Sequence, residues 1–175
     1  MVDDKTLILE FLDGNVESFN TLILQHEGWV HDMIYQIVKH KEDAEDLCQD
    51  VFVKVYFELK RFRFESAFKT WLYRIVINRI NNYFRKQKLL NWFGHELKEE
   101  MTCAEYNHSA KKDKIYKMTY QLPKTQRNIV LLRIYQDLPF NTIGSILSIT
   151  ENSAKVSFYK AKENLKEYLN KKNGK

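Results

Sequence analysis

The sequence predicts an all-α protein made of two small helical domains that a flexible linker joins. Apolar residues recur at spacings of three and four along most of the chain, and this period is typical of helices that bury one face. Glycine and proline are scarce, with 5 and 2 among 175 residues, whereas all-β chains need many turns. The helical period is lost over residues 89–113, so we expect one domain over residues 1–88 and a second over residues 114–175.

The first domain is expected to hold four helices, of which the first covers residues 5–13. Gly14 favours the end of that helix, and Asn15 is suited to cap the second, whose apolar stripe runs from Phe19 to Val38. A turn at residues 40–41 and a loop at residues 61–65 separate the remaining helices, which are expected over residues 44–59 and 66–88.

The second domain is expected to begin with a helix over residues 115–120. The next helix starts after Leu122-Pro123, because proline suits the first turn of a helix. A short helix over residues 140–147 follows, and after a turn at Ser148-Ile149, Thr150 can cap the last helix. The inward stripe of that last helix is Ala154, Phe158, Ala161, Leu165 and Leu169.

Residues 140–165 have the layout of a helix-turn-helix, with a short helix, a tight turn, a capping threonine and a longer basic helix. Gly144 stands where the first helix must approach the second closely. The second helix of such motifs enters the major groove, where lysine pairs with phosphate or guanine and valine touches a thymine methyl. A helical hairpin with a solvated lysine face is the alternative. The candidate base-contacting side chains are Asn152, Ser153, Lys155, Val156, Ser157, Tyr159 and Lys160.

A basic and aromatic block covers residues 61–88. Its cations can follow a nucleic-acid backbone, and single-stranded bases can stack on its rings at roughly 1–3 kcal/mol each. For Trp71 a core position is favoured over stacking, and Tyr83 suits either role. Amides that can read an extruded base are supplied by Asn78, Asn81 and Asn82.

The first 50 residues are strongly acidic, with 12 acidic and 3 basic residues, whereas the next 38 hold 10 basic and 2 acidic residues. Basic segments attract polyanions, and an acidic segment suits a basic protein partner. Asp43, Asp46 and Asp50 share one helix face, which can be a metal site, a solvated face or a docking face. We favour docking, because the face lies beside Phe52 and Tyr56, whose rings can be exposed. A metal site is disfavoured, because carboxylates on one exposed helix diverge and no second motif completes the site.

The chain opens without the basic-then-apolar order of a signal peptide, and no apolar run approaches the roughly 18 residues of a membrane span. Cys48 and Cys103 have no partner at zinc-ligand spacing. They are expected to be thiols in a reducing cytoplasm, with a disulfide as the alternative. We expect no catalytic residue, metal, cofactor or small-molecule substrate.

Three segments carry a family resemblance. Asp43–Phe52 resembles the region 2.2 signature of bacterial sigma factors, and Phe68–Ile75 resembles regions 2.3 to 2.4 of the small extracytoplasmic-function (ECF) group of the sigma-70 family. Leu122–Leu165 is similar to their region 4. The segments stand in the family's order and spacing over nearly the whole chain. The resemblance implies a region 2 bundle, a region 4 helix-turn-helix, and a role in directing promoter recognition, DNA melting and transcription initiation.

The resemblance also implies partners. The acidic helix would dock on the clamp helices of core RNA polymerase through Asp46, Gln49, Asp50 and Phe52, and region 4 would meet the flap and the minus-thirty-five element. An anti-sigma factor would control the protein, which is expected in the cytoplasm or held at the membrane through that inhibitor. The linker would thread toward the polymerase active site. Melted minus-ten DNA, with a flipped base near Asn78, would contact Arg61, Phe64, Trp71, Arg74, Asn78, Asn82, Tyr83 and Lys86.

The chain departs from the family pattern in the helix-turn-helix. Ser148 stands where the family often has glycine, and serine is costlier there if the backbone is left-handed. Ser157 stands where arginine is frequent, and Ser153-Ala154 where Thr-Val is frequent, which bears on base preference. A stand-alone duplex-binding regulator and a metal-dependent nuclease are the two other function classes. The regulator would not need a stacking platform, and the nuclease would have to cleave DNA with magnesium.

Overall fold

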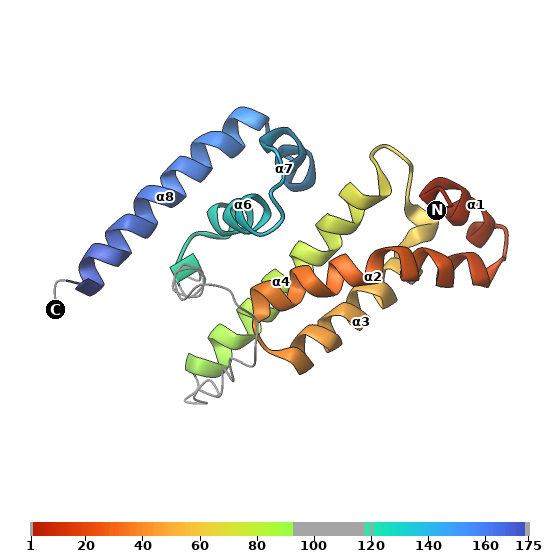
Figure 1. The fold of residues 1–175 in the computed structure, drawn as a ribbon, viewed down its shortest axis with the longest axis horizontal. Coiled ribbons are helices and arrows are strands. Elements are labelled where there is room, and N and C mark those ends of the chain that lie inside the picture. Colours follow the sequence, from red (N-terminus) through yellow and green to blue (C-terminus); the bar gives the residue numbers. More distant parts are fainter. Residues whose placement is uncertain (1, 93–117, 120, 174–175) are drawn as a thin grey trace. The chain divides into compact units, whose positions relative to one another are not determined.

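The structure is a computed structural model that describes residues 2–92, 118–119 and 121–173. These described residues form helices and no strand, which confirms the predicted all-α class. The chain divides into two compact units, Met1–Asn82 and Tyr83–Lys175, and helix α4 (Phe68–Trp92) contributes to both (Figure 1). Most of the expected linker and of the helix expected at residues 115–120 lies outside the described residues, as does Cys103.

The N-terminal unit is organised around α2 (Val16–Val38), which packs against α1 (Asp4–Leu12) and α3 (Lys41–Glu58). A short 3-10 helix, η1 (Leu59–Arg61), leads from α3 toward α4. The apolar stripes expected from the helical period form the core of this unit. Its largest fully buried side chains are Ile8, Leu22, Met33, Ile34, Ile37, Leu59, Leu72 and Ile80.

Local signals end and start these helices where they were expected, with small shifts. Gly14 follows α1 with φ of +103°, a left-handed conformation that favours glycine. The Asn15 side chain accepts a hydrogen bond from the Glu17 amide at 3.1 Å and caps α2. The ring of His40 caps α3 by accepting from the Asp43 amide at 3.3 Å. Helix α3 therefore begins at Lys41, three residues before the predicted start.

A buried histidine ties three helices together in a way the period does not predict. His26 on α2 is buried, and its Nε2 lies 2.7 Å from Oδ1 of Asp4 on α1. The indole of Trp29 donates to Nδ1 of His26 at 3.0 Å, and Phe68 of α4 packs against the imidazole with ring centroids 5.1 Å apart. Both ring nitrogens are thus satisfied, which avoids the cost of an unpaired buried polar group.

In the C-terminal unit, α6 (Lys124–Ile134) and α7 (Phe140–Leu147) pack against α8 (Glu151–Asn173). Pro123 stands at the start of α6, as predicted. The bounds of α7 are the predicted ones. Ala154 and Ala161 of α8 are buried, and Phe158 and Leu165 pack on a core cluster with Leu122. The predicted inward stripe of the last helix is therefore confirmed in its N-terminal half.

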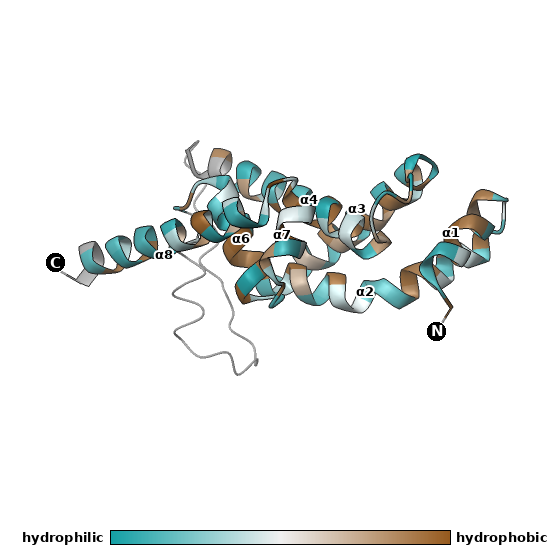
Figure 2. Cartoon of the chain, turned by 90° about the horizontal axis from the view of Figure 1, so that it is seen from above, coloured by the Kyte–Doolittle hydropathy of each residue, from teal (hydrophilic) through white to brown (hydrophobic). Residues whose placement is uncertain are grey.

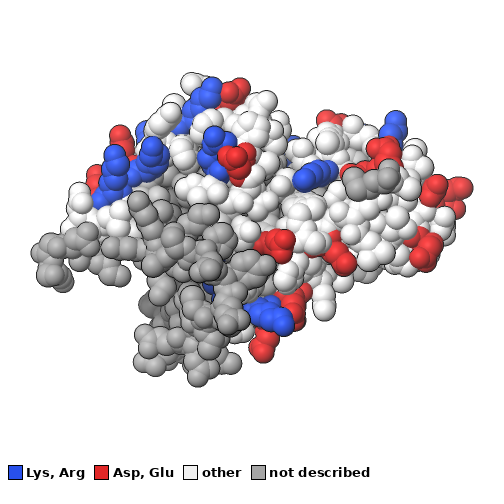
Figure 3. Space-filling model, in the orientation of Figure 1, with Lys and Arg blue, Asp and Glu red and all other residues white. Residues whose placement is uncertain are grey.

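The two units differ in surface character. Helix α8 is largely hydrophilic along its length (Figure 2). On the face that Figure 3 shows, acidic side chains are scattered over the N-terminal unit, whereas several lysine and arginine side chains lie over α8. Among the described residues, no helix has both the length and the apolar character that crossing a membrane would require.

Candidate nucleic-acid interface

The turn between α7 and α8 is closed tightly on Gly144. A Cβ added to Gly144 would lie 2.7 Å from the carbonyl oxygen of Ile149. That carbonyl belongs to the turn itself, and the Ile149 amide donates back to the carbonyl of Gly144 at 2.9 Å. Ser148 at the turn has φ of 56° and ψ of 44°, the left-handed conformation in which a side chain is strained. The close approach expected at Gly144 is confirmed.

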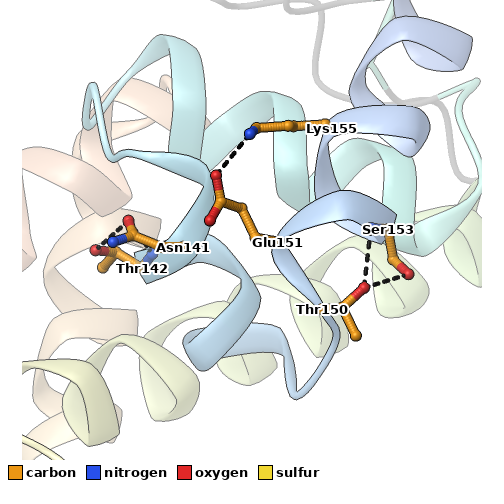
Figure 4. A network of polar contacts seen from close by, with 6 residues as sticks. All are labelled: Asn141, Thr142, Thr150, Glu151, Ser153 and Lys155. Carbon is orange, nitrogen blue, oxygen red and sulfur yellow. Dashed lines mark hydrogen bonds and ion pairs between the residues drawn. The ribbon is translucent and has the colours of Figure 1, made fainter.

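The first turn of α8 is held by a cap and an ion pair, both drawn in Figure 4. The Ser153 amide donates to Oγ1 of Thr150 at 3.1 Å, which confirms Thr150 as the cap. The hydroxyl of Thr150 in turn lies 2.8 Å from that of Ser153. Glu151 pairs with Lys155 one turn later at 2.7 Å. Two of the predicted base-contacting side chains, Ser153 and Lys155, thus also make contacts within the first turn of α8.

The outward face of α8 is available for a ligand. Tyr159 is 60% exposed and Val156 is 46% exposed, so both side chains are accessible on this face. Ser157 is half-buried. The remaining predicted residues of this face are exposed, namely Asn152, Ser153, Lys155 and Lys160.

A cluster of aromatic rings forms the start of α4 and the loop before it. Phe62 is buried, and its ring centroid lies 4.8 Å from that of Phe64 and 5.2 Å from that of Trp71. Phe64 has φ of 57° and is partly exposed. Trp71 is half-buried and also contacts Phe68. Its ring therefore serves mainly to pack within the cluster. Arg61 is exposed at the edge of this cluster.

Helix α4 carries the predicted polar groups on one side. Arg74, Asn78, Asn82 and Lys86 recur at intervals of four, and the last three are exposed. Tyr83 and Arg74 are half-buried. Asn81, which was grouped with the other two asparagines, is instead buried. Asn81 is only three residues from Asn78, so its burial, and not helical spacing, distinguishes it, and the two exposed amides are those of Asn78 and Asn82.

Lys69 is one of the cations of the basic and aromatic block, and it makes a contact that the sequence does not predict. Its ammonium lies 5.2 Å from the ring centroid of Trp29, within the range of a cation–π contact. Trp29 is fixed by its hydrogen bond to His26 and by the Tyr73 ring at 4.6 Å. The contact between the two side chains could not be predicted from the sequence, because Trp29 and Lys69 lie on different helices.

Of the four side chains predicted to form the docking face of α3, three are exposed and one is buried. Asp46, Gln49 and Asp50 are exposed. Phe52 is buried, with 8% of its surface exposed, so the expectation that it lies on the docking face is wrong. It stands eight residues after buried Ala44 and three before buried Val55, which puts it on the inner face of the helix. No group of acidic, histidine or cysteine side chains suited to a metal occurs among the described residues.

An ion pair and a half-buried thiol add to the chemistry of this helix. Asp50 lies 3.7 Å from the guanidinium of Arg79 on α4. Cys48 is half-buried and reduced, and burial, with a smaller contribution from the charge of Glu27, raises its pKa to about 11. A thiol with so high a pKa carries little thiolate at neutral pH and is a poor nucleophile.

Known proteins match this chain in both units. The family model described as Sigma-70 region 2 matches residues 22–89, and the model described as Sigma-70, region 4 matches residues 112–165. The RNA polymerase sigma-H factor of Pseudomonas aeruginosa is 26% identical, with 91% of this chain and 90% of that protein covered. The ECF RNA polymerase sigma-E factor of Escherichia coli is also 26% identical, with 91% of each chain covered.

Solved structures agree on the fold. CnrH, in its complex with the cytosolic domain of CnrY, has a TM-score of 0.66 at 18% identity, covering 95% of this chain and 97% of that one. The sigma factor RpoE, in complex with the anti-sigma factor NepR from Bartonella quintana, has a TM-score of 0.64 at 21% identity, covering 88% and 98%. The chain therefore belongs to the sigma-70 family of RNA polymerase sigma factors, in its extracytoplasmic-function group.

Proposed function

We propose that this sigma factor binds core RNA polymerase, brings it to selected promoters and holds the melted strand, with no catalysis of its own. One observation carries the proposal: the chain has two surfaces suited to nucleic acid, one on α4 and one on α8, and an acidic face on α3 that nucleic acid would repel. A stand-alone duplex reader needs neither the aromatic cluster before α4 nor the acidic face of α3. Such a factor works where the polymerase works, in the cytoplasm.

The duplex-reading surface of the proposal is the outward face of α8. The helix-turn-helix places the N-terminal part of a second helix in the major groove, and the exposed side chains there include hydrogen-bonding, cationic and apolar types. Lys155 and Lys160 suit phosphate or guanine, Asn152 suits a base edge, and Val156 suits a thymine methyl. With Ser153, Ser157 and Tyr159, these residues would read the minus-thirty-five element.

The melted-strand surface is α4 with the loop before it. Exposed Asn78 and Asn82 offer amides one turn apart, and the partly exposed Phe64 offers a ring for stacking. Arg61, Arg74 and Lys86 supply cations for the backbone, and Tyr83 flanks the amides. Trp71 contributes mainly by supporting the aromatic cluster. We propose that this surface contacts the minus-ten element.

The docking surface is the exposed acidic side of α3, through Asp46, Gln49 and Asp50. Acidic groups suit a basic protein surface, and in the family this region meets the clamp helices of the polymerase, while region 4 meets the flap. We further propose control by an anti-sigma factor that covers one or both surfaces. The family resemblance and the RpoE complex with NepR support that partner.

Pull-down of purified core polymerase, followed by run-off transcription on a promoter library, tests the proposal. Asp50→Arg is expected to weaken polymerase binding by about tenfold or more, because it places a cation where the partner is basic. Asp32→Arg is the matched control, since its carboxylate on α2 is 76% exposed outside the docking surface. Equal binding by both variants would show that the acidic face is only solvated, and a chain that does not bind polymerase at all would refute the function.

Asn78→Ala separates base reading from docking. The variant should bind core polymerase as the unchanged chain does, and it should lose roughly 1–3 kcal/mol of promoter discrimination. The measurement is transcription from the selected promoters against variants of their minus-ten element. Equal activity of the Ala variant across all those promoters would show that no base is read at Asn78.

A further inference from the structure

Helix α3 carries an exposed apolar continuation of its acidic face. Asp46, Asp50, Val53 and Phe57 follow one another at spacings of four, three and four, so they lie on one stripe of the helix, here called the α3 stripe. Val53 is 55% exposed and Phe57 is 71% exposed. Two carboxylates are therefore followed by two apolar side chains over about three turns, all facing solvent.

The exposed ring of Phe57 is supported from below. It contacts Tyr56 edge-on, with ring centroids 5.5 Å apart. Tyr56 in turn contacts Phe11 at 5.4 Å and Phe19 at 5.2 Å, and both of these rings are buried. Phe57 is the outer end of an aromatic series rooted in the core. A ring held in this way loses little conformational freedom when a partner covers it.

Two of the charges beside Phe57 neutralise each other, and the exposed cations Lys60 and Arg61 follow in η1. Lys54 and Glu58 flank the ring in sequence and pair with each other at 2.6 Å. The acidic end of the stripe keeps Asp46 exposed, and Asp50 retains 60% exposure despite its contact with Arg79. A complementary surface thus needs cationic side chains facing the two aspartates and apolar side chains facing Val53 and Phe57.

We propose that the α3 stripe is one continuous docking surface for core polymerase, in which Phe57 is the apolar anchor and Val53 its neighbour. This inference rests on the proposed function, and it adds an apolar half to the acidic half. It also replaces buried Phe52 as the apolar element of the interface. Interfaces derive most of their affinity from a few side chains that become fully covered, and aromatic residues are common among them. The continuity of this stripe with the acidic face selects the same partner.

Equilibrium binding of the labelled full chain to core polymerase, measured at several salt concentrations, tests the stripe. Phe57→Ser is expected to weaken binding about 10- to 30-fold and Val53→Ser about 3- to 10-fold, whereas Phe57→Leu should stay within about threefold. Leu24→Ser is the matched control, because Leu24 on α2 is 70% exposed and lies off the stripe. Since an apolar contact carries no charge, Phe57→Ser should leave the salt dependence of binding unchanged, whereas Asp50→Arg should alter it.

The outcomes separate this proposal from the proposed function. If Asp50→Arg weakens binding and Phe57→Ser behaves like Leu24→Ser, the apolar half is overturned and the function stands. If the unchanged chain does not bind polymerase, both fail. If light scattering finds a dimer that Phe57→Ser dissolves while polymerase binding is unchanged, the occupant is a second copy and the proposal is overturned. Because Phe57 is exposed, its Ser variant should melt within roughly 2 °C of the unchanged chain, so loss of fold would be visible.

Discussion

Replacing Gly144 by alanine should damage the helix-turn-helix by a mechanism that can be isolated. The added Cβ would meet Ile149 O at 2.7 Å, Glu151 N at 3.3 Å and Thr150 C at 3.4 Å. All three atoms belong to the backbone, so no side chain can rotate away. The turn would have to move by several tenths of an ångström, and with it the start of α8, which carries the candidate base contacts.

The magnitude follows from two opposing effects. Overpacking of a tight contact costs about 1–3 kcal/mol, while alanine in place of glycine inside a helix gains up to about 1 kcal/mol. Alanine at Gly28 on α2 should show only the gain in helix stability, without overpacking, because Gly28 is exposed and nothing lies within 4 Å of its added Cβ. Gly28→Ala is therefore expected to stabilise its unit by about 0.5–1 kcal/mol. The difference between the two substitutions should be about 1–3 kcal/mol.

Urea unfolding followed by circular dichroism, with hydrogen exchange to assign each transition to its unit, measures both variants. Gly144→Ala should lower the stability of the C-terminal unit relative to Gly28→Ala in its own unit, and it should weaken duplex promoter binding about tenfold or more, because a small misplacement of α8 misaligns several contacts at once. If Gly144→Ala stabilised its unit as much as Gly28→Ala does, the backbone contact would not be limiting and the reasoning would be wrong.

Three other outcomes are expected. Ser148→Gly should stabilise the C-terminal unit by about 0.5–1 kcal/mol in the same unfolding assay, because it removes left-handed strain, and a destabilised variant would contradict this. Glu151→Gln should release Lys155 and raise affinity for non-specific duplex with a steeper salt dependence; unchanged titrations would mean that the ion pair is irrelevant to binding. Alkylation of Cys48 should be slow at pH 8 and should keep accelerating up to about pH 11 instead of levelling off near 9.0, the ordinary thiol value. Because the folded pKa is the higher one, stability should fall as pH rises between about 9 and 11.

Much of the fold was predictable because its signals are local. The bounds of α7, the caps at Asn15 and Thr150, and the close approach at Gly144 all follow from residue types within a few positions of each other. The His26 network was not predictable, since its partner Asp4 is 22 residues away. Spacing can show that His26 lies on an inward face, but only tertiary structure brings a carboxylate to it.

The site was predictable in residue type and less so in orientation. Asp46, Asp50 and Asn78 are exposed, as binding residues must be. Phe52 was expected on the docking face, first from its place beside the acidic residues and then from the family resemblance, although its spacing from Ala44 and Val55 puts it on the buried face. The same spacing places Phe57 outward. The helical period was therefore the better guide to exposure, whereas the choice of α3 as the helix that binds a partner stays a prediction.

Several proposed binding residues already hold a partner within the chain, and the strengths of these contacts explain why they need not obstruct binding. Lys155 pairs with Glu151 at 2.7 Å and Asp50 with Arg79 at 3.7 Å, and each pair includes side chains open to solvent. Such pairs contribute about 0–1 kcal/mol, whereas a well-placed base contact contributes about 1–3 kcal/mol. A cognate partner therefore gains more free energy from its contact than is lost when the internal pair breaks. Every partner that must break an internal pair loses about the same free energy, so the pair lowers affinity by up to about 1 kcal/mol and leaves the discrimination between such partners unchanged.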